Sequence, residues 1–415
     1  MPTPPTRLLR AACPLLAAIV VSLASSPAAT GARSDPQRPM PPAALAPLWA
    51  ELRVSIAASP ASLSAQLIER WQGHAPLERD VWLENCANAP VEAADRRTAL
   101  FMLGASGSNE DLPRFGLLAA SAFERADEGI EACVEVVVRD WLLRSPQALA
   151  GLPSLSDRLV PELRCALHAG VAKGAPGRAM DYLTNRLGAS SAEDSVILGL
   201  IGAYAQVPEQ GPPARLLQRA RAALTSTDVH LRREAALALG RLEDPEAAVA
   251  LAELLDSPEQ GERQAAAWAL QRITGLALAP ESAAWLGWLA AEQAFWEESG
   301  ADLLRRLPSL NRKQQAEALR ELSQHPWRRA DIARALAPLL ACDDPKVARL
   351  TACVLADLGG QVAQSVLEAS VGSGDEELSA SLAAALQRVA PAPRVSRRVV
   401  TVGARDSSNR PTDGR

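Results

Sequence analysis

The sequence has few aromatic side chains and few lysines. Aromatic residues make up 4% of the 415 positions, and lysine occurs three times among 43 basic residues. A scarcity of aromatic and β-branched residues argues against an all-β protein. Alanine is abundant instead, at about a fifth of the chain, and leucine, arginine, glutamate and glutamine are also strong helix formers. We therefore expect an all-α fold.

Cysteine is also scarce, and six in the whole chain are too few for a disulfide-stabilised scaffold. Cys13 lies in an N-terminal apolar run. The other five are Cys86, Cys133, Cys165, Cys342 and Cys353. Their spacing matches no zinc-binding pattern. Two interpretations stay open: buried thiols inside helices, or one or two disulfides, with Cys342–Cys353 as the closest pair.

The common catalytic motifs are missing too. Serine nucleophile elbows, phosphate-binding loops and glycine-rich dinucleotide turns are absent. The four histidines are His74, His168, His230 and His325. None of them lies at a metal-ligand spacing from a cysteine or another histidine. The sequence therefore predicts no metal site, no cofactor and no catalytic residue.

Residues 1–31 have the three-part layout of a secretory signal peptide. Arg7 and Arg10 form a positive region, residues 11–24 are apolar and uncharged, and small residues follow at 25–32. This layout predicts export to the periplasm or the cell exterior after cleavage. An uncleaved signal anchor is the alternative, because the stretch could just reach across a bilayer. Only in that case do we expect association with a membrane.

The net charge of −5 is unevenly distributed. Residues 1–31 carry two arginines and no acid, and residues 391–415 carry six arginines and two aspartates, which leaves the body between them near −11. An acidic body repels phosphate backbones, so we expect no nucleic-acid partner. The basic tail at 391–415 has the composition of a disordered segment.

The chain repeats itself at a fixed period. Residues 232–242 (RREAALALGRL) recur 31 residues later at 263–273 (RQAAAWALQRI), and 348–358 and 379–389 are related by the same offset. In each copy the apolar positions follow one helical face. Alanine on that face lets neighbouring helices approach closely. After the first copy Asp244 is expected to cap a second helix, so each unit is a helical hairpin.

Residues 228–273 closely resemble the short HEAT-like repeats of bacterial proteins, the type that phycobilin lyases also carry. In those repeats an arginine opens the first helix, alanine-rich turns follow, and a Gly-x-x-Asp-Pro-like turn leads into the second helix, here between Gly240 and Pro245. The resemblance implies an α-solenoid of stacked antiparallel hairpins. Some HEAT-like proteins are iron hydroxylases with paired His-Glu motifs, but no histidine of this chain precedes a glutamate.

The helix starts carry arginines beside acidic residues. Arg232, Arg263 and Arg349 open their helices, with acids such as Asp228 and Glu262 close by. One interpretation is a charged ridge for a partner. The other, which the family resemblance also implies, is a ladder of ion pairs that ties neighbouring repeats together.

The expected organisation follows from the repeats. A flexible linker at 32–40 precedes degenerate hairpins at 41–225, in which one helix is expected to run unbroken over 156–172. HEAT-like repeats then occupy 226–390, interrupted by an inserted tryptophan-rich helix at 280–298.

The inserted helix supplies the candidate binding residues. In a helix from Glu281 to Glu298, Trp285, Trp288 and Trp296 project within about 60° of one another. The stripe is either a shelf for a protein partner, because tryptophan dominates binding hot spots, or the surface that packs the helix onto the solenoid.

These features favour an exported, non-enzymatic scaffold that holds a protein partner along the solenoid. An enzyme, for example a lyase, with its active site in the solenoid groove is the first alternative. It would carry a groove lined by titratable groups with shifted pKa values. A scaffold that stays at the membrane through an uncleaved signal is the second alternative.

Overall fold

A computed structural model describes residues 39–59, 64–106, 108–204, 211–342, 344–371 and 376–389. In these ranges the chain forms α-helices joined by short 3₁₀ and π turns, and no β-strand occurs there. The all-α class expected from the composition is therefore confirmed. The predicted signal peptide, most of the predicted linker and the basic tail lie outside the described residues.

The helices follow one another with short connections. In chain order they are α1 (Ala46–Ala58), α2 (Ala65–Gly73), α3 (Pro76–Asn88), α4 (Ala93–Ser106), α5 (Leu112–Glu124), α6 (Ile130–Arg144), α7 (Leu152–Ser156), α8 (Pro161–Gly174), α9 (Pro176–Arg186), α10 (Ser191–Tyr204), α11 (Ala214–Ala223), α12 (Val229–Arg241), α13 (Ala248–Leu254), α14 (Gln260–Thr274), α15 (Ser282–Phe295), α16 (Ala301–Arg306), α17 (Arg312–Ser323), α18 (Arg329–Leu340), α19 (Pro345–Leu358), α20 (Gly360–Ala369) and α21 (Glu376–Val389).

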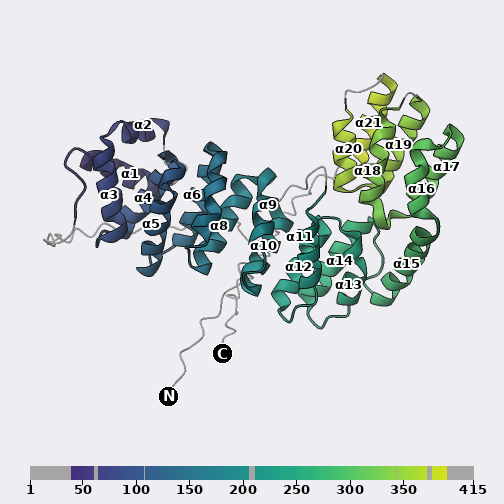
Figure 1. Cartoon of the computed structure of the whole chain (residues 1–415), viewed down its shortest axis with the longest axis horizontal. Coiled ribbons are helices and arrows are strands. Elements are labelled where there is room, and N and C mark those ends of the chain that lie inside the picture. The colour runs from purple at the N-terminus through teal and green to yellow at the C-terminus, as the bar shows by residue number, and fades with distance from the viewer. Residues whose placement is uncertain are drawn as a thin grey trace, which may run out of the picture.

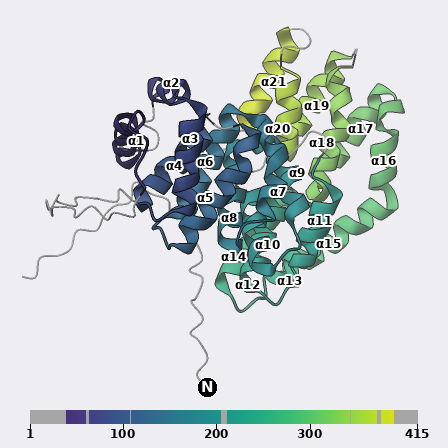
Figure 2. The same cartoon turned by 60° about the vertical axis from the view of Figure 1, so that its left-hand side comes forward.

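The helices form two stacks. In the first stack, α1 to α14, the helices α4, α6, α8, α10, α12 and α14 pack one after another in a continuous row. In the second stack, α17 to α21, the row is α17, α19 and α21, backed by α18 and α20. Helices α15 and α16 connect the stacks, and the second stack stands at an angle to the first (Figures 1 and 2). The fold is an α-solenoid whose row of hairpins changes direction once.

Small residues set the spacing within the rows. The alanines predicted at the contact between α12 and α14, Ala235 and Ala266 among them, are fully buried. The closest approaches use glycine. A Cβ atom on Gly170 of α8 would lie 2.8 Å from the carbonyl oxygen of Glu135 on α6, and one on Gly240 would lie 2.7 Å from the Cα of Ala269 on α14. Helices at this distance leave no room for a side chain on the facing residue.

One predicted helix is broken. The expectation of an unbroken helix over 156–172 is wrong, because α7 ends at Ser156 and α8 begins only at Pro161. Val160 between them is extended, with ψ of 156°. A residue that precedes proline is sterically disfavoured in the helical region, and proline itself suits the first helical position. The Val-Pro pair therefore separates two helices that the apolar pattern had merged.

The ion-pair ladder is present in part, mostly with glutamate as the acidic partner. The pairs that join the starts of successive helices include Arg164 to Glu193 at 2.9 Å, Arg232 to Glu262 at 2.7 Å, Arg349 to Glu377, and Arg312 to Asp344 at 3.1 Å. Arg263 instead donates to the carbonyl oxygens of Ser257 and Pro258. Asp228 instead caps its own helix, where its carboxylate accepts from the backbone N–H of His230 at 2.9 Å. Asp244 occupies the N-cap position of the 3₁₀ turn Pro245–Ala247, as expected, but its carboxylate accepts from Arg221 of α11 at 2.6 and 2.7 Å and makes no cap hydrogen bond.

Candidate functional site

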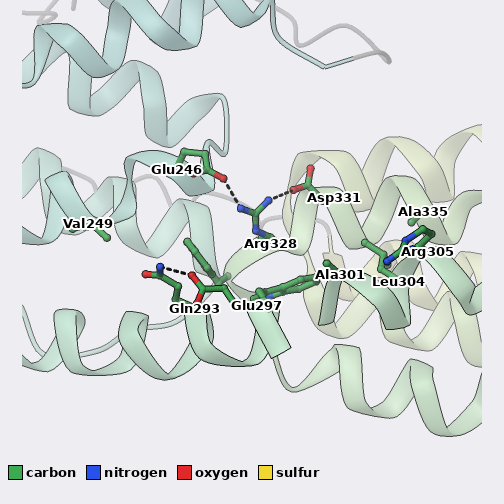
Figure 3. Close-up of a pocket in the computed structure, with 12 residues that line it drawn as sticks. Glu246, Val249, Gln293, Glu297, Ala301, Leu304, Arg305, Arg328, Asp331 and Ala335 are labelled. Carbon is green, nitrogen blue, oxygen red and sulfur yellow. Dashed lines mark hydrogen bonds and ion pairs between the residues drawn. The ribbon is translucent and has the colours of Figure 1, made fainter. Parts of the chain in front are cut away.

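A pocket of about 720 Å³ lies where the two stacks meet. The start of α13 forms one wall, the segment that joins α15 to α16 forms the floor, and the start of α18 forms the opposite wall. Figure 3 shows Glu246 and Val249 from the first wall, Gln293 and Glu297 from the floor, and Asp331 from the second wall. No single repeat could supply this lining, because it combines parts of both stacks with the connection between them.

The floor of the pocket is a π turn. The chain is helical up to Glu298, as the sequence predicts, but α15 ends at Phe295 and residues Trp296–Gly300 form a π turn before α16 begins. A Cβ atom on Gly300 would lie 2.8 Å from the indole of Trp296. The glycine therefore lets this indole lie directly against the helix backbone. Such turns occur frequently at functional sites.

Arg328 spans the pocket wall. Its guanidinium lies 5.2 Å from the ring centre of Trp327 and 6.0 Å from that of Trp296, within the range of cation–π attraction. It also pairs with Glu246 of the first stack and, at 3.5 Å, with Asp331 of α18 (Figure 3). Two indoles and an arginine held by two carboxylates thus form one cluster that bridges the stacks.

Five consecutive residues, 325–329 (His-Pro-Trp-Arg-Arg), fasten the second stack to the first; we refer to them as the junction segment. The ring of His325 stacks on Phe295 of α15, with ring centres 3.4 Å apart, and its Nδ1 lies 3.0 Å from Oε1 of Glu292. The indole N–H of Trp327 donates to the carbonyl oxygen of Pro245 at 3.0 Å. Each contact joins the segment to a helix or turn that precedes it by dozens of residues.

Arg329 is the buried end of the junction segment. It donates to the carbonyl oxygens of Arg272 and, at 3.0 Å, of Leu358, which are at the ends of α14 and α19. It also lies 3.3 Å from Oε1 of Glu243. As the first residue of α18, this cation faces the positive end of its own helix dipole. The carbonyls at the two helix C-termini and the Glu243 carboxylate offset that cost.

One comparison with known proteins, the match to a family model, fits this architecture. Residues 181–271 match the family model for HEAT repeats. The match covers α10 to α14 together with part of α9, and it includes the repeat quoted above. A solved structure of an engineered protein from the Northeast Structural Genomics Consortium is 18% identical, over 82% of this chain and 94% of that chain, at a TM-score of 0.31. No curated protein matches the chain. The HEAT-like solenoid is thus supported by a family match within the region where the sequence repeat is strongest.

The three candidate tryptophans occupy different places in the helical array. Trp296 lines the pocket, although only 6% of its surface is exposed. Trp285 is buried and meets the half-buried Trp288 edge to face, with ring centres 6.0 Å apart. The structure therefore separates Trp296 from the other two, and the binding role of the stripe stays a prediction. Trp327 and Arg328, which complete the pocket, were not among the predicted site residues; the only sequence signal for them is the Trp-Arg-Arg run after a proline.

A buried polar cluster ties α8, α9 and α10 together. Nε2 of His168 lies 3.1 Å from Oε1 of Glu193, and Nδ1 lies 3.2 Å from the hydroxyl of Tyr182. Burial lowers the pKa of His168 and raises the pKa of Tyr182. The hydrogen bond with His168, followed by that with Arg164, holds the pKa of Glu193 near 2. Because all three side chains are buried in the packed array, the cluster is a structural tie between hairpins.

This cluster makes a testable prediction about acid stability. A histidine with a lowered folded-state pKa loses stability as the pH falls below its ordinary value of 6.5, and a carboxyl held near 2 loses its contribution as the pH falls below 4.5. We expect the free energy of unfolding to fall from pH 6.5 downward, by at most about 1.4 kcal/mol per pH unit from His168. Urea titrations from pH 7 to pH 4 measure this. His168→Gln should flatten the curve between pH 6.5 and 5, and an unchanged slope in that variant would contradict the assignment.

The remaining candidate groups offer no further site. The cysteines at positions 86, 133, 165, 342 and 353 are free thiols; Cys86 and Cys133 are buried, as one interpretation expects, whereas Cys165 and Cys342 are half-buried and Cys353 is exposed. Burial raises the pKa of Cys133 to about 12 and that of Cys165 to about 11, which makes both poor nucleophiles. In the described ranges His, Cys, Asp and Glu do not gather into a group that could hold a metal ion. No helix described here combines the length and apolarity that a bilayer crossing requires.

Proposed function

We propose that this protein is an exported scaffold that binds a protein partner at the pocket between its two stacks and catalyses no reaction. HEAT repeats are interaction scaffolds, and residues 181–271 match their family model. Stacked hairpins suit this role because they present an extended surface to a partner. The proposal of export rests on the signal-peptide layout of residues 1–31.

The lining of the pocket is the observation that carries the proposal. Trp296, Trp327 and Arg328 are of the two residue types most enriched in binding hot spots. Charged groups around them, Glu246, Glu297 and Arg305 among them, form a polar rim, as at other protein interfaces. A volume of about 720 Å³ accommodates a few side chains of a partner.

The enzyme alternative predicts a groove lined by titratable groups whose pKa values are shifted. The cluster of His168, Tyr182 and Glu193 carries such shifts, but it is buried between α8, α9 and α10 and does not line the pocket. This location favours the scaffold.

The test fills the pocket without removing its framework. Ala301 lines the pocket on an exposed position of α16, so Ala301→Trp should block it while the chain still folds. Ala284→Trp, on an exposed position of α15 outside the pocket, is the matched control. With the full chain as bait in an envelope fraction, we expect a protein captured by the wild type and by Ala284→Trp, and a loss of about tenfold or more with Ala301→Trp. Equal capture by all three, or capture of nothing, would refute the proposal.

Export has a separate test. Mass spectrometry of the protein from its native cells is expected to find a mature N-terminus after residue 28 or 31, where small residues stand at the cleavage-determining spacing. A chain that begins at Met1 would contradict cleavage.

A further inference from the structure

Two arginines pair with a single buried carboxylate beside the pocket, and a third lies nearby. Arg241 and Arg272 lie in the last turns of α12 and α14, and Arg329 opens α18. Between them lies the buried Glu243, whose Oε1 is 3.3 Å from Nη2 of Arg329 and 3.7 Å from Nη2 of Arg272. The same oxygen accepts from the backbone N–H of Gln361 at 2.9 Å, at the start of α20. Two of these guanidinium groups pair with the Glu243 carboxylate, and Arg241 adds a third positive charge nearby.

The three arginines differ in how many of their N–H donors have hydrogen-bond acceptors. Arg329 donates to two carbonyl oxygens and to Glu243. Arg272 has a buried Nε and a buried Nη2 for which no described atom accepts a hydrogen bond. The buried Nε of Arg241 likewise has no acceptor among the described atoms. The side-chain amide of Gln361 faces the other two nitrogens of Arg241, but it is uncharged. Buried donors without acceptors are costly, so this pair is suited to an added anion.

The electrostatics point the same way. Burial, and then the charge of Arg272, lower the pKa of Arg241. The two cations therefore repel each other across a partly desolvated space. An anion between them would attract both cations. The summed charge of the three arginines, Glu243 and the added anion would still be positive.

The pair can be reached from solvent. The side chain of Arg272 is 32% exposed, and Trp268 beside it is 39% exposed. The guanidinium of Arg272 lies 6.0 Å from the centre of the Trp268 indole. A Cβ atom on Gly240 would lie 2.8 Å from this indole, so the ring can pack here only because the residue before Arg241 is glycine. An exposed indole thus lies against both α12 and α14, next to the two arginines.

We propose that Arg241, Trp268 and Arg272 form a second docking site, which binds a carboxylate side chain of an acidic segment in the protein partner. The two guanidinium groups bind the carboxylate oxygens, and the indole packs against the methylene groups of the same acidic side chain. Charge complementarity selects this occupant, since a cationic or neutral segment would leave the excess positive charge uncompensated. The inference rests on the proposed scaffold function and adds the chemistry of the partner.

The test uses the full chain and a fluorescein-labelled hexaglutamate peptide, with hexaglutamine as the neutral probe. Fluorescence anisotropy should show binding of hexaglutamate and at least tenfold weaker binding of hexaglutamine. We expect Arg241→Gln and Arg272→Gln each to weaken hexaglutamate binding about tenfold or more. Arg272→Lys, which keeps the charge but loses the fork of donors, should fall between Arg272→Gln and the wild type.

Arg320→Gln is the matched control, because it removes the same charge from an exposed position on α17. The inference is overturned if this control weakens binding as much as the site variants, or if the wild type does not bind the peptide. Inorganic phosphate should displace the peptide more strongly than chloride at equal ionic strength, because the site recognises oxyanions. Equal displacement would mean general screening and would also overturn the inference.

The failure of this inference can be told apart from the failure of the proposed function. Circular dichroism and thermal melting first establish that Arg241→Gln and Arg272→Gln remain folded. If the double variant still captures the envelope partner at wild-type level while Ala301→Trp loses it, the scaffold proposal stands and the carboxylate site is rejected. Loss of capture in the folded double variant supports the site.

Discussion

Arg329→Met is expected to loosen the second stack and to lower the free energy of unfolding by about 3–5 kcal/mol. The substitution leaves the carbonyl oxygens of Arg272 and Leu358 without their donor. It also leaves the carboxylate of Glu243 buried with only Arg272, at 3.7 Å, as a charged partner. Breaking a buried pair by removing one member is costly because the other charge remains desolvated.

Urea denaturation measures the total loss, and hydrogen exchange locates it. We expect faster amide exchange in α18 and α20, which meet at Arg329, and little change in α4 to α8. Arg320→Met on α17, which donates only to the carbonyl oxygen of Ala316, is the control and should change stability by less than about 0.5 kcal/mol. A similar loss in both variants would mean that Arg329 contributes no more than a surface arginine.

A double substitution separates the charge from the packing. Glu243→Gln removes the carboxylate that loses its partner in Arg329→Met. The double variant should therefore lose less free energy of unfolding than the sum of the losses in the two single variants. Additive losses would show that the ion pair itself is not the stabilising contact.

Gly170→Val is expected to destabilise the first stack by about 3 kcal/mol, at the upper end of the usual cost of overpacking. A Cβ atom there would lie 2.8 Å from both the carbonyl oxygen of Glu135 and the Cβ of Val138. The first contact is with backbone, so α6 and α8 must move apart. Because these helices are central in the row, separation also strains the Arg164–Glu193 pair that joins α8 to α10.

Gly287 provides the matched control. It lies in the interior of α15, and nothing would lie within 4 Å of an added Cβ atom. Gly287→Val should be neutral or slightly stabilising, because glycine is the poorer helix former. Thermal unfolding of the two variants compares them directly. Equal melting temperatures would show that α6 and α8 can move apart without a loss of stability.

The sequence predicted the parts of the fold that depend on local contacts. The hairpins around α12 and α14 were recognisable because the residues that pack together recur at a 31-residue offset, as Ala235 and Ala266 do. The glycines that bring helices closest were less visible, because a single glycine in a helix has no sequence signature of contact. The break before Pro161 was readable in principle from the proline, but the apolar pattern outweighed it.

The pocket could be predicted only in part. Trp296 was a candidate because it projects within about 60° of Trp285 and Trp288 on a helical wheel, yet of the three only Trp296 lines the pocket. Arg329 and Glu243 are 86 residues apart, and no periodic pattern relates them. Contacts of this kind depend on the angle between the stacks, which the side chains of the junction segment set together. Such an angle is a property of the folded chain and of no single repeat.

The junction segment also limits how this array can change in length. A solenoid ordinarily gains or loses repeats freely, because each repeat contacts only its neighbours. Here the turn at Glu243, the end of α14 and the end of α19 converge on Arg329. A hairpin duplicated between α12 and α20 would carry these partners apart, whereas one added before α10 would leave them in place. Growth or shortening by whole repeats is therefore expected in the amino-terminal half and excluded between α12 and α20.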